Sequence, residues 1–210
     1  MSFKNKGYVL IRDFIPEYLS NFLYSYIHLK KKVFHTLRDQ KIISPYNLDW
    51  GSRGDTMIPN TFSLYGDTPL DALLAFVKEK VEKKSGLKLN ESYSYARIYE
   101  KGDVLKKHVD RKSCAVSATL NLGGDSWPIY LLDKNNIKIK ALLKPGDALL
   151  YQGTKVLHWR EAFKGEYCGQ LFLHYVNKKK NKPYDNRLHL GLPESIHSCG
   201  LTINQYNKRG

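Results

Sequence analysis

Residues 99–110 read YEKGDVLKKHVD: a tyrosine, a Gly-Asp turn, two lysines, and then His108 and Asp110 separated by one residue. On a strand, side chains two positions apart point to the same face, so an imidazole nitrogen and a carboxylate oxygen would lie side by side. Two adjacent ligands hold a metal weakly, and a third has to come from elsewhere in the sheet. We expect it to be His158, in the apolar stretch VLHWR that follows a Lys-Pro-Gly-Asp turn.

This set of ligands indicates which metal chemistry to expect. Two histidines and one carboxylate on one face of an octahedron leave three positions open, which is typical of non-haem Fe(II) oxygenases. Zinc hydrolases use other ligand sets, in which a water completes a tetrahedron. A His-x-Asp pair alone is weak evidence, because most such pairs are surface residues. The prediction of a metal site at His108, Asp110 and His158 therefore depends on a sheet that brings them together.

The chain after Leu87 predicts such a sheet. Seven short stretches of strand composition follow one another with turn signals and no helix between them: SYSYARIY, AVSATLNL, WPIYLL, IKIKALL, DALLYQ, VLHWR and YCGQLFLHYV. Strands this short and this regularly spaced predict a barrel or a two-sheet jelly roll.

The first 90 residues predict elements that support the sheet. We expect a strand over residues 8–11, a first helix after Pro16, and a second helix over residues 68–85. The second helix would be capped by Thr68 and ended by Gly86. Between the helices, residues 44–66 have no period but contain many large apolar side chains, so this loop either packs over another part of the protein or clamps a ligand. We expect it to form part of a lid. The first helix, after Pro16, has a stripe of apolar residues that should pack on the sheet: Leu19, Phe22, Leu23, Tyr26 and Ile27.

Length and composition predict one globular domain. The 210 residues are 42% hydrophobic and 12% aromatic, and two separate domains would each be small. No stretch approaches the roughly 18 apolar residues of a membrane span, and the first residues contain no signal-peptide pattern, so we expect a cytoplasmic protein. The three cysteines, Cys114, Cys168 and Cys199, are odd in number and widely spaced, which favours reduced thiols.

The charge balance suggests a partner. The chain carries 34 Lys and Arg against 20 Asp and Glu, a formal charge of +14, and a strong positive field attracts phosphate backbones. Nucleic acid is therefore one candidate partner. A lysine-rich surface with no such partner explains the same number equally well.

Four motifs together resemble a known family. They are Tyr99-x-x-Gly-x-x-Leu-x-x-His108-x-Asp110, Ser117-Ala-Thr-Leu-Asn-Leu, Lys144-Pro-Gly-Asp-Ala-Leu-Leu-Tyr151 and His158-Trp-Arg. In this order they resemble the Fe(II)/2-oxoglutarate-dependent dioxygenases, specifically the prolyl 4-hydroxylase-like branch. The resemblance extends over roughly residues 60–177.

The resemblance implies an α+β protein with a double-stranded β-helix (jelly roll, cupin-like) core over residues 91–177. Residues 1–90 would supply the supporting strand and helices, and residues 178–210 a basic C-terminal extension of the same domain. Iron would be held by His108, Asp110 and His158, with 2-oxoglutarate chelating the iron and dioxygen as the second cosubstrate. No catalytic side chain beyond the ligands is implied.

The resemblance also implies a cation for the distal carboxylate of 2-oxoglutarate, since an unpaired buried carboxylate is unfavourable. Family members usually place an Arg or Lys about ten residues after the second histidine, but this chain has Tyr167 and Cys168 there. Arg160 is the first alternative, because it lies two residues after His158 and so on the same face of a strand. A guanidinium can hold a carboxylate with two parallel hydrogen bonds.

Arg97 is the second alternative for this cation. Tyr95, Arg97 and Tyr99 alternate onto one face, and if that face lines the barrel, Arg97 could bind the carboxylate. The family places a tyrosine hydroxyl on the cosubstrate near the position of Tyr99. Arg111, directly after Asp110, would orient the carboxylate of Asp110 or contact the substrate.

We therefore expect an oxygenase that hydroxylates a C–H bond of a protein side chain, such as proline, or of a small molecule. A nucleic-acid-modifying, demethylase-like oxygenase is the alternative that the charge favours. The alternative from another class is a cupin-like metal-binding barrel without oxygenase activity. The sequence indicates neither the substrate nor the oligomeric state.

Overall fold

The computed structural model describes residues 3–179, 187 and 189–192. The described helices are α1 (Phe3–Lys6), α2 (Glu17–Asp39), α3 (Thr68–Phe76) and α4 (Lys78–Ser85), with a 3₁₀ turn η1 (Lys112–Cys114). The strands of the larger sheet are β1 (Tyr8–Ile11), β2 (Ser52–Arg53), β3 (Phe62–Tyr65), β4 (Leu89–Glu100), β6 (Val116–Gly124), β9 (Ala148–Tyr151) and β11 (Tyr167–Asn177). Those of the smaller sheet are β5 (Leu105–His108), β7 (Ile129–Leu132), β8 (Lys138–Ala141) and β10 (His158–Arg160).

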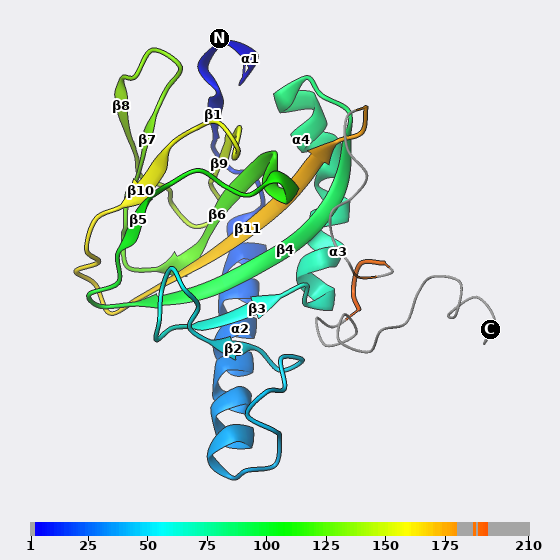
Figure 1. The fold of residues 1–210 in the computed structure, drawn as a ribbon, viewed down its shortest axis with the longest axis vertical. Helices are drawn as coiled ribbons and strands as arrows, with labels where there is room; N and C mark the ends of the chain where they lie inside the picture. The colour runs from blue at the N-terminus through cyan, green and yellow to red at the C-terminus, as the bar shows by residue number, and fades with distance from the viewer. Residues whose placement is uncertain (1–2, 180–186, 188, 193–210) are drawn as a thin grey trace, which may run out of the picture.

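Two antiparallel sheets form the body of the protein (Figure 1). The larger sheet has the order β1-β9-β6-β11-β4-β3-β2, and the smaller one has the order β5-β10-β7-β8. Helices α2 and α3 pack against the outer face of the larger sheet, where they contact β4 and β6. The predicted set of short strands after Leu87, and the helical support before it, are confirmed.

The larger sheet presents two different faces because side chains alternate along each strand. Its outer face is apolar and forms the main core with the helices. Its inner face, toward the smaller sheet, carries polar and aromatic side chains. The outer face of β4, β6 and β11 consists of Ala96, Ile98, Ala118, Leu120, Leu122, Leu171 and Leu173. The inner face of the same strands includes Tyr93, Arg97, Tyr99, Ser117, Thr119, Gln170 and His174.

Three details of the predicted helices are wrong. Thr68, the predicted cap, is the first residue of α3, and Asp67 occupies the cap position. The stripe of α2 is buried through Leu23, Ile27 and Phe34, whereas Phe22 is 63% exposed, because the buried face of the helix is narrower than the apolar pattern. The segment after Asp67 forms two helices that meet at Val77. Gly86 ends the second helix in the left-handed conformation, as predicted.

Residues 44–66 are more regular than their sequence predicts. β2 and β3 lie within this segment, and β3 pairs with β4 at the edge of the larger sheet. Residues 54–61 form the loop between the two strands. Whether the segment acts as a lid stays a prediction.

The remaining predictions about organisation have mixed outcomes. Cys114 and Cys168 are buried free thiols, and Cys199 lies outside the described residues. Most of the predicted extension over residues 178–210 also lies outside them, so the division into one domain stays a prediction. No helix in the described part of the chain is long and apolar enough to cross a membrane.

A buried carboxylate ties α3 to the larger sheet and to the C-terminal segment. Asp71 accepts hydrogen bonds from the backbone N–H and hydroxyl of Ser94 on β4, at 3.1 and 2.7 Å. Its other oxygen accepts from the Arg187 guanidinium at 2.7 Å and from the Gly191 backbone N–H at 2.8 Å. Both side chains of the ion pair are almost fully buried.

Asp71→Asn is expected to lower the free energy of unfolding by about 3–5 kcal/mol, the range for removing one partner of a buried ion pair. Urea unfolding followed by circular dichroism measures the change. The control is Glu161→Gln, which removes an exposed pair with Lys138 and is expected to cost less than about 1 kcal/mol. Equal costs for the two variants would contradict this account of the anchor.

Candidate functional site

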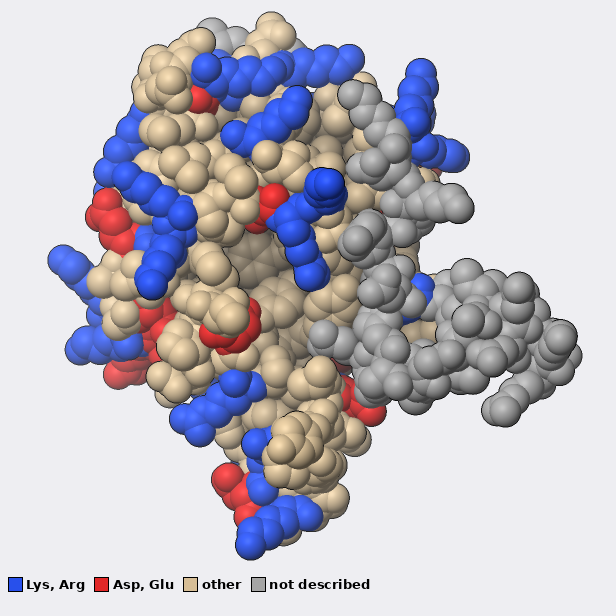
Figure 2. Space-filling model, in the orientation of Figure 1, with Lys and Arg blue, Asp and Glu red and all other residues tan. Residues whose placement is uncertain are grey.

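A cavity of about 490 Å³ lies between the two sheets. Its walls come from β4, β5, β9, β10 and β11, and residues 55–58 of the loop between β2 and β3 close one side. In Figure 2 a hollow lies in the middle of the face, with acidic and basic side chains on its rim. The volume is within the range of about 300–1,000 Å³ that is common for small-molecule sites.

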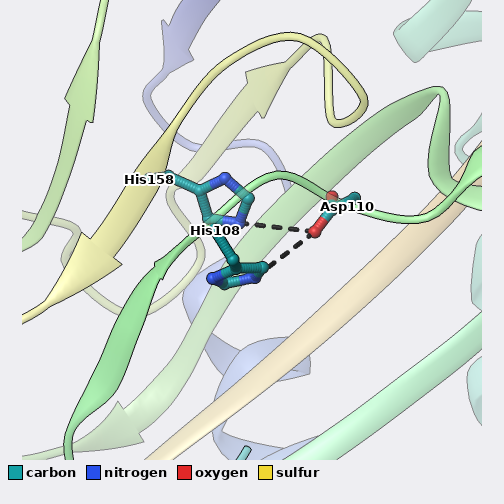
Figure 3. A group of neighbouring side chains, drawn as sticks. All are labelled: His108, Asp110 and His158. Carbon is teal, nitrogen blue, oxygen red and sulfur yellow. Dashed lines mark ion pairs between the residues drawn. The ribbon is translucent and has the colours of Figure 1, made fainter.

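The structure brings the three predicted ligands together on one wall of this cavity (Figure 3). The Nε2 atoms of His108 and His158 lie 3.6 and 3.4 Å from the same oxygen, Oδ1 of Asp110. One ligand atom from each residue lies within 4.8 Å of the others. His158 is buried, and the other two side chains are half-buried. Among the described residues, this is the one His, Cys, Asp and Glu cluster of such geometry.

Strand pairing positions the histidines but not the carboxylate. β5 pairs with β10 so that His108 lies directly opposite His158. The prediction that His108 and Asp110 share a strand is wrong, because β5 ends at His108 and Asp110 lies in the turn that follows. The backbone N–H of Asp110 donates to the Gly153 carbonyl at 2.8 Å, which holds the turn against the loop before β10.

Hydrogen bonds set the tautomers of both histidines for metal binding. The Nδ1 of His108 lies 2.8 Å from the Lys106 carbonyl, and that of His158 lies 2.9 Å from the Val156 carbonyl. A carbonyl oxygen only accepts, so each Nδ1 must carry a hydrogen, and Nε2 is the nitrogen of each ring that is left to bind a metal. Both Nε2 atoms face the Asp110 carboxylate, and a ring whose other N–H donates to a backbone carbonyl has the usual orientation of a metal-binding histidine.

The electrostatics of the cluster suit a cation. Burial disfavours the charged imidazole of His108, but hydrogen bonds with Asp110 and the Lys106 carbonyl outweigh it and raise its pKa above the ordinary value. Burial also disfavours ionised Asp110, but hydrogen bonds from His108 and His158 hold the pKa of its carboxyl well below the usual range. The carboxylate therefore stays charged, and a bound metal would compete with a proton for Nε2 of His108.

The second oxygen of Asp110 is enclosed by Ser117 and Gly153. The Ser117 hydroxyl donates to Oδ2 of Asp110 at 2.7 Å. A Cβ at Gly153 would overlap this oxygen and the Cys114 carbonyl, and would lie 2.8 Å from Ser117 Oγ. The missing side chain at Gly153 therefore makes the space that the carboxylate occupies.

Arg160 is buried on the predicted strand and has an unusual environment. Only 1% of its surface is exposed. Its terminal nitrogens donate to the Trp127 carbonyl and, at 3.0 Å, to the Gln170 side-chain oxygen, while its Nε–H has no partner among the described residues. Burial lowers its pKa, and no described carboxylate pairs with it. The guanidinium is thus a buried charge that the described protein does not neutralise, although it is not one of the residues that line the cavity.

Arg97 lines the cavity, but its hydrogen bonds are already used. It pairs with Asp55 and the Tyr95 hydroxyl, and donates to the Thr61 hydroxyl at 2.7 Å and to the Ile58 carbonyl at 3.1 Å. Burial opposes the charge of Asp55, but Arg97 and local backbone hydrogen bonds lower its pKa. In this structure, Arg97 fastens the loop between β2 and β3 to β4.

The two other predicted site residues also reach the cavity. Tyr99 is buried on its wall. Arg111 lines it too, with its guanidinium 4.8 Å from the centre of the Tyr93 ring and its Nε donating to the Tyr93 hydroxyl at 3.1 Å. Arg111 therefore does not orient Asp110 by a hydrogen bond. The roles of Tyr99 and Arg111 toward a ligand stay predictions.

Three further residues of the site were not assigned a role from the sequence: Ser117, Gly153 and His174. Ser117 and His174 face the ligand wall because they alternate with apolar core residues on β6 and β11, a signal that the strand pattern contained. Gly153 gave no signal, since it lies in an ordinary turn and its proximity to Asp110 arises from chain segments more than forty residues apart.

Gly153→Ala is expected to weaken metal binding by about 10- to 100-fold, the range for disturbing groups that orient a ligand, because the new methyl group would displace the Asp110 carboxylate. Titration of metal-free protein with Co(II) against a competing chelator measures the affinity. The neighbouring Gln152→Ala is the control, and circular dichroism checks that both variants fold. Unchanged affinity in folded Gly153→Ala would contradict the role of this space.

Comparison with known proteins gives structural likeness without sequence matches. No protein-family model and no curated protein sequence matches the chain. A prolyl-4-hydroxylase from Pseudomonas putida superposes with a TM-score of 0.60 at 15% identity, covering 84% of this chain and 95% of that one. The non-haem α-ketoglutarate-dependent carbocyclase SnoK from nogalamycin biosynthesis has a TM-score of 0.65 at 11% identity, covering 91% and 92%.

A third solved structure contains ligands. HygX from Streptomyces hygroscopicus, with nickel and 2-oxoglutarate bound, has a TM-score of 0.61 at 13% identity, covering 84% of this chain and 85% of that one. All three likenesses extend over most of both chains, although the identities are low. The chain therefore has the fold of the 2-oxoglutarate-dependent oxygenases, which its motifs predicted.

Proposed function

We propose that this chain is an Fe(II)- and 2-oxoglutarate-dependent oxygenase that hydroxylates a C–H bond, with its two sheets forming a double-stranded β-helix. The observation that carries the proposal is the convergence of Nε2 of His108, Nε2 of His158 and Oδ1 of Asp110 on one cavity wall. Two imidazoles and one carboxylate are the ligand set of non-haem Fe(II) oxygenases. The nickel and 2-oxoglutarate bound to HygX support the same pair of ligands for this cavity.

When bound, iron and 2-oxoglutarate supply the oxidation, in which one atom of dioxygen enters a substrate C–H bond and the other enters succinate, with release of CO₂. The protein supplies binding and orientation. His108, His158 and Asp110 would hold the metal through their facing ligand atoms. The buried cavity walls of aromatic side chains would exclude water around it.

Arg160 is our choice for the distal carboxylate of 2-oxoglutarate. Arg97 lines the cavity, but its donors already bind Asp55, Thr61 and the Ile58 carbonyl. Arg160 has a donor without a partner and a charge without a described counter-ion. Buried charges are normally paired, so an incoming carboxylate is the partner that this environment favours. Tyr99, which is buried on the cavity wall, would contact the same ligand.

The substrate would enter from the side closed by the loop between β2 and β3. Asp55, Met57 and Ile58 of this loop line the same cavity as the metal ligands, which supports the proposal that residues 44–66 act as a lid. Arg111 would meet the substrate at this mouth. The cavity volume suits a small molecule or a single protein side chain, such as proline. A nucleic-acid substrate is supported by the charge of +14 alone.

His108→Ala and Asp110→Ala are each expected to abolish binding of 2-oxoglutarate to the Fe(II)-loaded protein, because two ligands hold a metal weakly. Anaerobic calorimetry measures 2-oxoglutarate binding, and succinate formation measures turnover. His35→Ala on α2, outside the cavity, is the control and should bind as the wild type does. If the wild-type protein binds neither Fe(II) nor 2-oxoglutarate, the proposed function is wrong, and the alternative of a barrel without oxygenase activity remains.

Arg160→Met is expected to weaken 2-oxoglutarate binding much more than Arg97→Met, because only Arg160 has free hydrogen-bonding capacity for a carboxylate. Arg97→Met should instead destabilise the protein, since the loop between β2 and β3 loses its attachment to β4. Calorimetry with 2-oxoglutarate and urea unfolding separate the two effects. If Arg97→Met causes the larger loss of binding while it remains folded, Arg97 is the carboxylate ligand.

A further inference from the structure

We propose that Ser117 and His174 are positioning residues that turn the Asp110 carboxylate so that a single oxygen faces the metal. Neither residue would contact the metal; both would act through Asp110. The inference rests on the proposed metal site and extends it by two residues on the inner face of the larger sheet. β6 and β11 pair so that Ser117 lies directly opposite His174.

The three side chains form a continuous chain of hydrogen bonds. The Ser117 hydroxyl lies 2.7 Å from Oδ2 of Asp110 and 3.0 Å from Nδ1 of His174. A third acceptor, the Cys114 carbonyl, lies farther from the hydroxyl at 3.3 Å. The hydroxyl has one hydrogen, and the short bond to a charged carboxylate is the strongest of the three options. We therefore assign that hydrogen to Asp110.

This assignment determines the tautomer of His174. Because the Ser117 hydrogen is directed to Asp110, the serine oxygen can only accept from His174, and Nδ1 must carry a hydrogen. His174 thus donates to Ser117, and Ser117 donates to Asp110. Each bond polarises the next in the same direction, as expected for a cooperative chain.

The imidazole of His174 is held in place for this task. It is 6% exposed, and its ring lies 4.6 Å from the Tyr93 ring and parallel to that of Phe172 at 6.4 Å. A packed histidine of this kind also occurs without any functional role. The direction of its hydrogen bond separates the two interpretations. His174 donates to Ser117, and Ser117 donates to Oδ2 of Asp110, the oxygen that faces away from the two histidines.

The consequence for the metal site is a carboxylate with one free oxygen. Oδ2 is occupied by Ser117, while Oδ1 faces both histidines at 3.4 and 3.6 Å. If Oδ2 were free, the carboxylate could turn and offer both oxygens to the metal. That would fill one of the positions that a cosubstrate and dioxygen need. The chain of hydrogen bonds therefore protects the open positions of the site.

The test compares three substitutions of His174 that differ in where they place a donor. His174→Asn puts its amide N–H near the position of Nδ1 and should keep the bond to Ser117. His174→Leu has almost the same shape as asparagine without the donor. His174→Gln carries its amide one atom farther out, near the position of Nε2. We expect Leu and Gln to weaken Co(II) affinity by about 10- to 100-fold, as for other groups that orient a ligand, and Asn to retain most of it.

Two further variants show whether His174 acts through Ser117. In a Ser117→Ala background, His174→Leu should cause no additional loss, since linked residues are not additive. X-ray absorption of the Co(II)-loaded protein should show an added carboxylate oxygen in His174→Leu but not in His174→Asn. Gln152→Ala, which alters no member of this chain of hydrogen bonds, is the control and should bind Co(II) as the wild type does.

Each outcome has a defined meaning. If His174→Leu and His174→Asn bind Co(II) equally, or if the losses of His174→Leu and Ser117→Ala multiply in the double variant, the positioning role is wrong while the metal site stands. If the wild type binds Co(II) no better than His108→Ala, the metal site itself is wrong, and the positioning role falls with it. Circular dichroism confirms that every variant is folded.

Discussion

The alternation of side chains across the seven-stranded sheet is the constraint on which the rest of the structure depends. Strand geometry sends successive residues to opposite faces, and α2 and α3 cover only one of them. The covered face must be apolar, and the main core confirms this. The opposite face is thereby free to carry Tyr93, Arg97, Ser117 and His174 toward the smaller sheet. One sheet thus supplies both the stability and a rigid wall for the cavity.

The buried charged groups of the protein differ in whether the described residues supply an opposite charge. A buried charge is unfavourable unless it is paired. Asp71 and Arg187 satisfy each other on the helical side, and Arg97 has Asp55. Asp110 has two histidines whose Nε2 atoms face one of its oxygens. Arg160 has no counter-ion among the described residues, which makes it a buried charge of a different kind from Arg97 and Arg187.

The sequence patterns predicted the helices and strands, because these depend on the local period of apolar residues. The patterns did not predict the positions of side chains that depend on contacts between distant segments. β1, the strands at the seven predicted stretches after Leu87, and the end of α4 at Gly86 follow from the alternation of side chains and from turn residues. The break at Val77 and the exposure of Phe22 do not, because an apolar pattern does not say how wide the buried face is. The three residues predicted as ligands do lie together, but Asp110 was placed on a strand that ends before it.

The position of Asp110 beyond the end of β5 bears on how its carboxylate is oriented. The spacing His-x-Asp is compatible with a strand or a turn, so it does not orient the carboxylate by itself. Orientation comes from the Gly153 carbonyl, the space that Gly153 leaves, and the hydroxyl of Ser117. These contacts require a backbone carbonyl, a glycine and one hydroxyl donor, all of which lie outside the His-x-Asp motif. The geometry of the cluster therefore depends on the segments around Gly153 and Ser117 as well as on the three clustered residues.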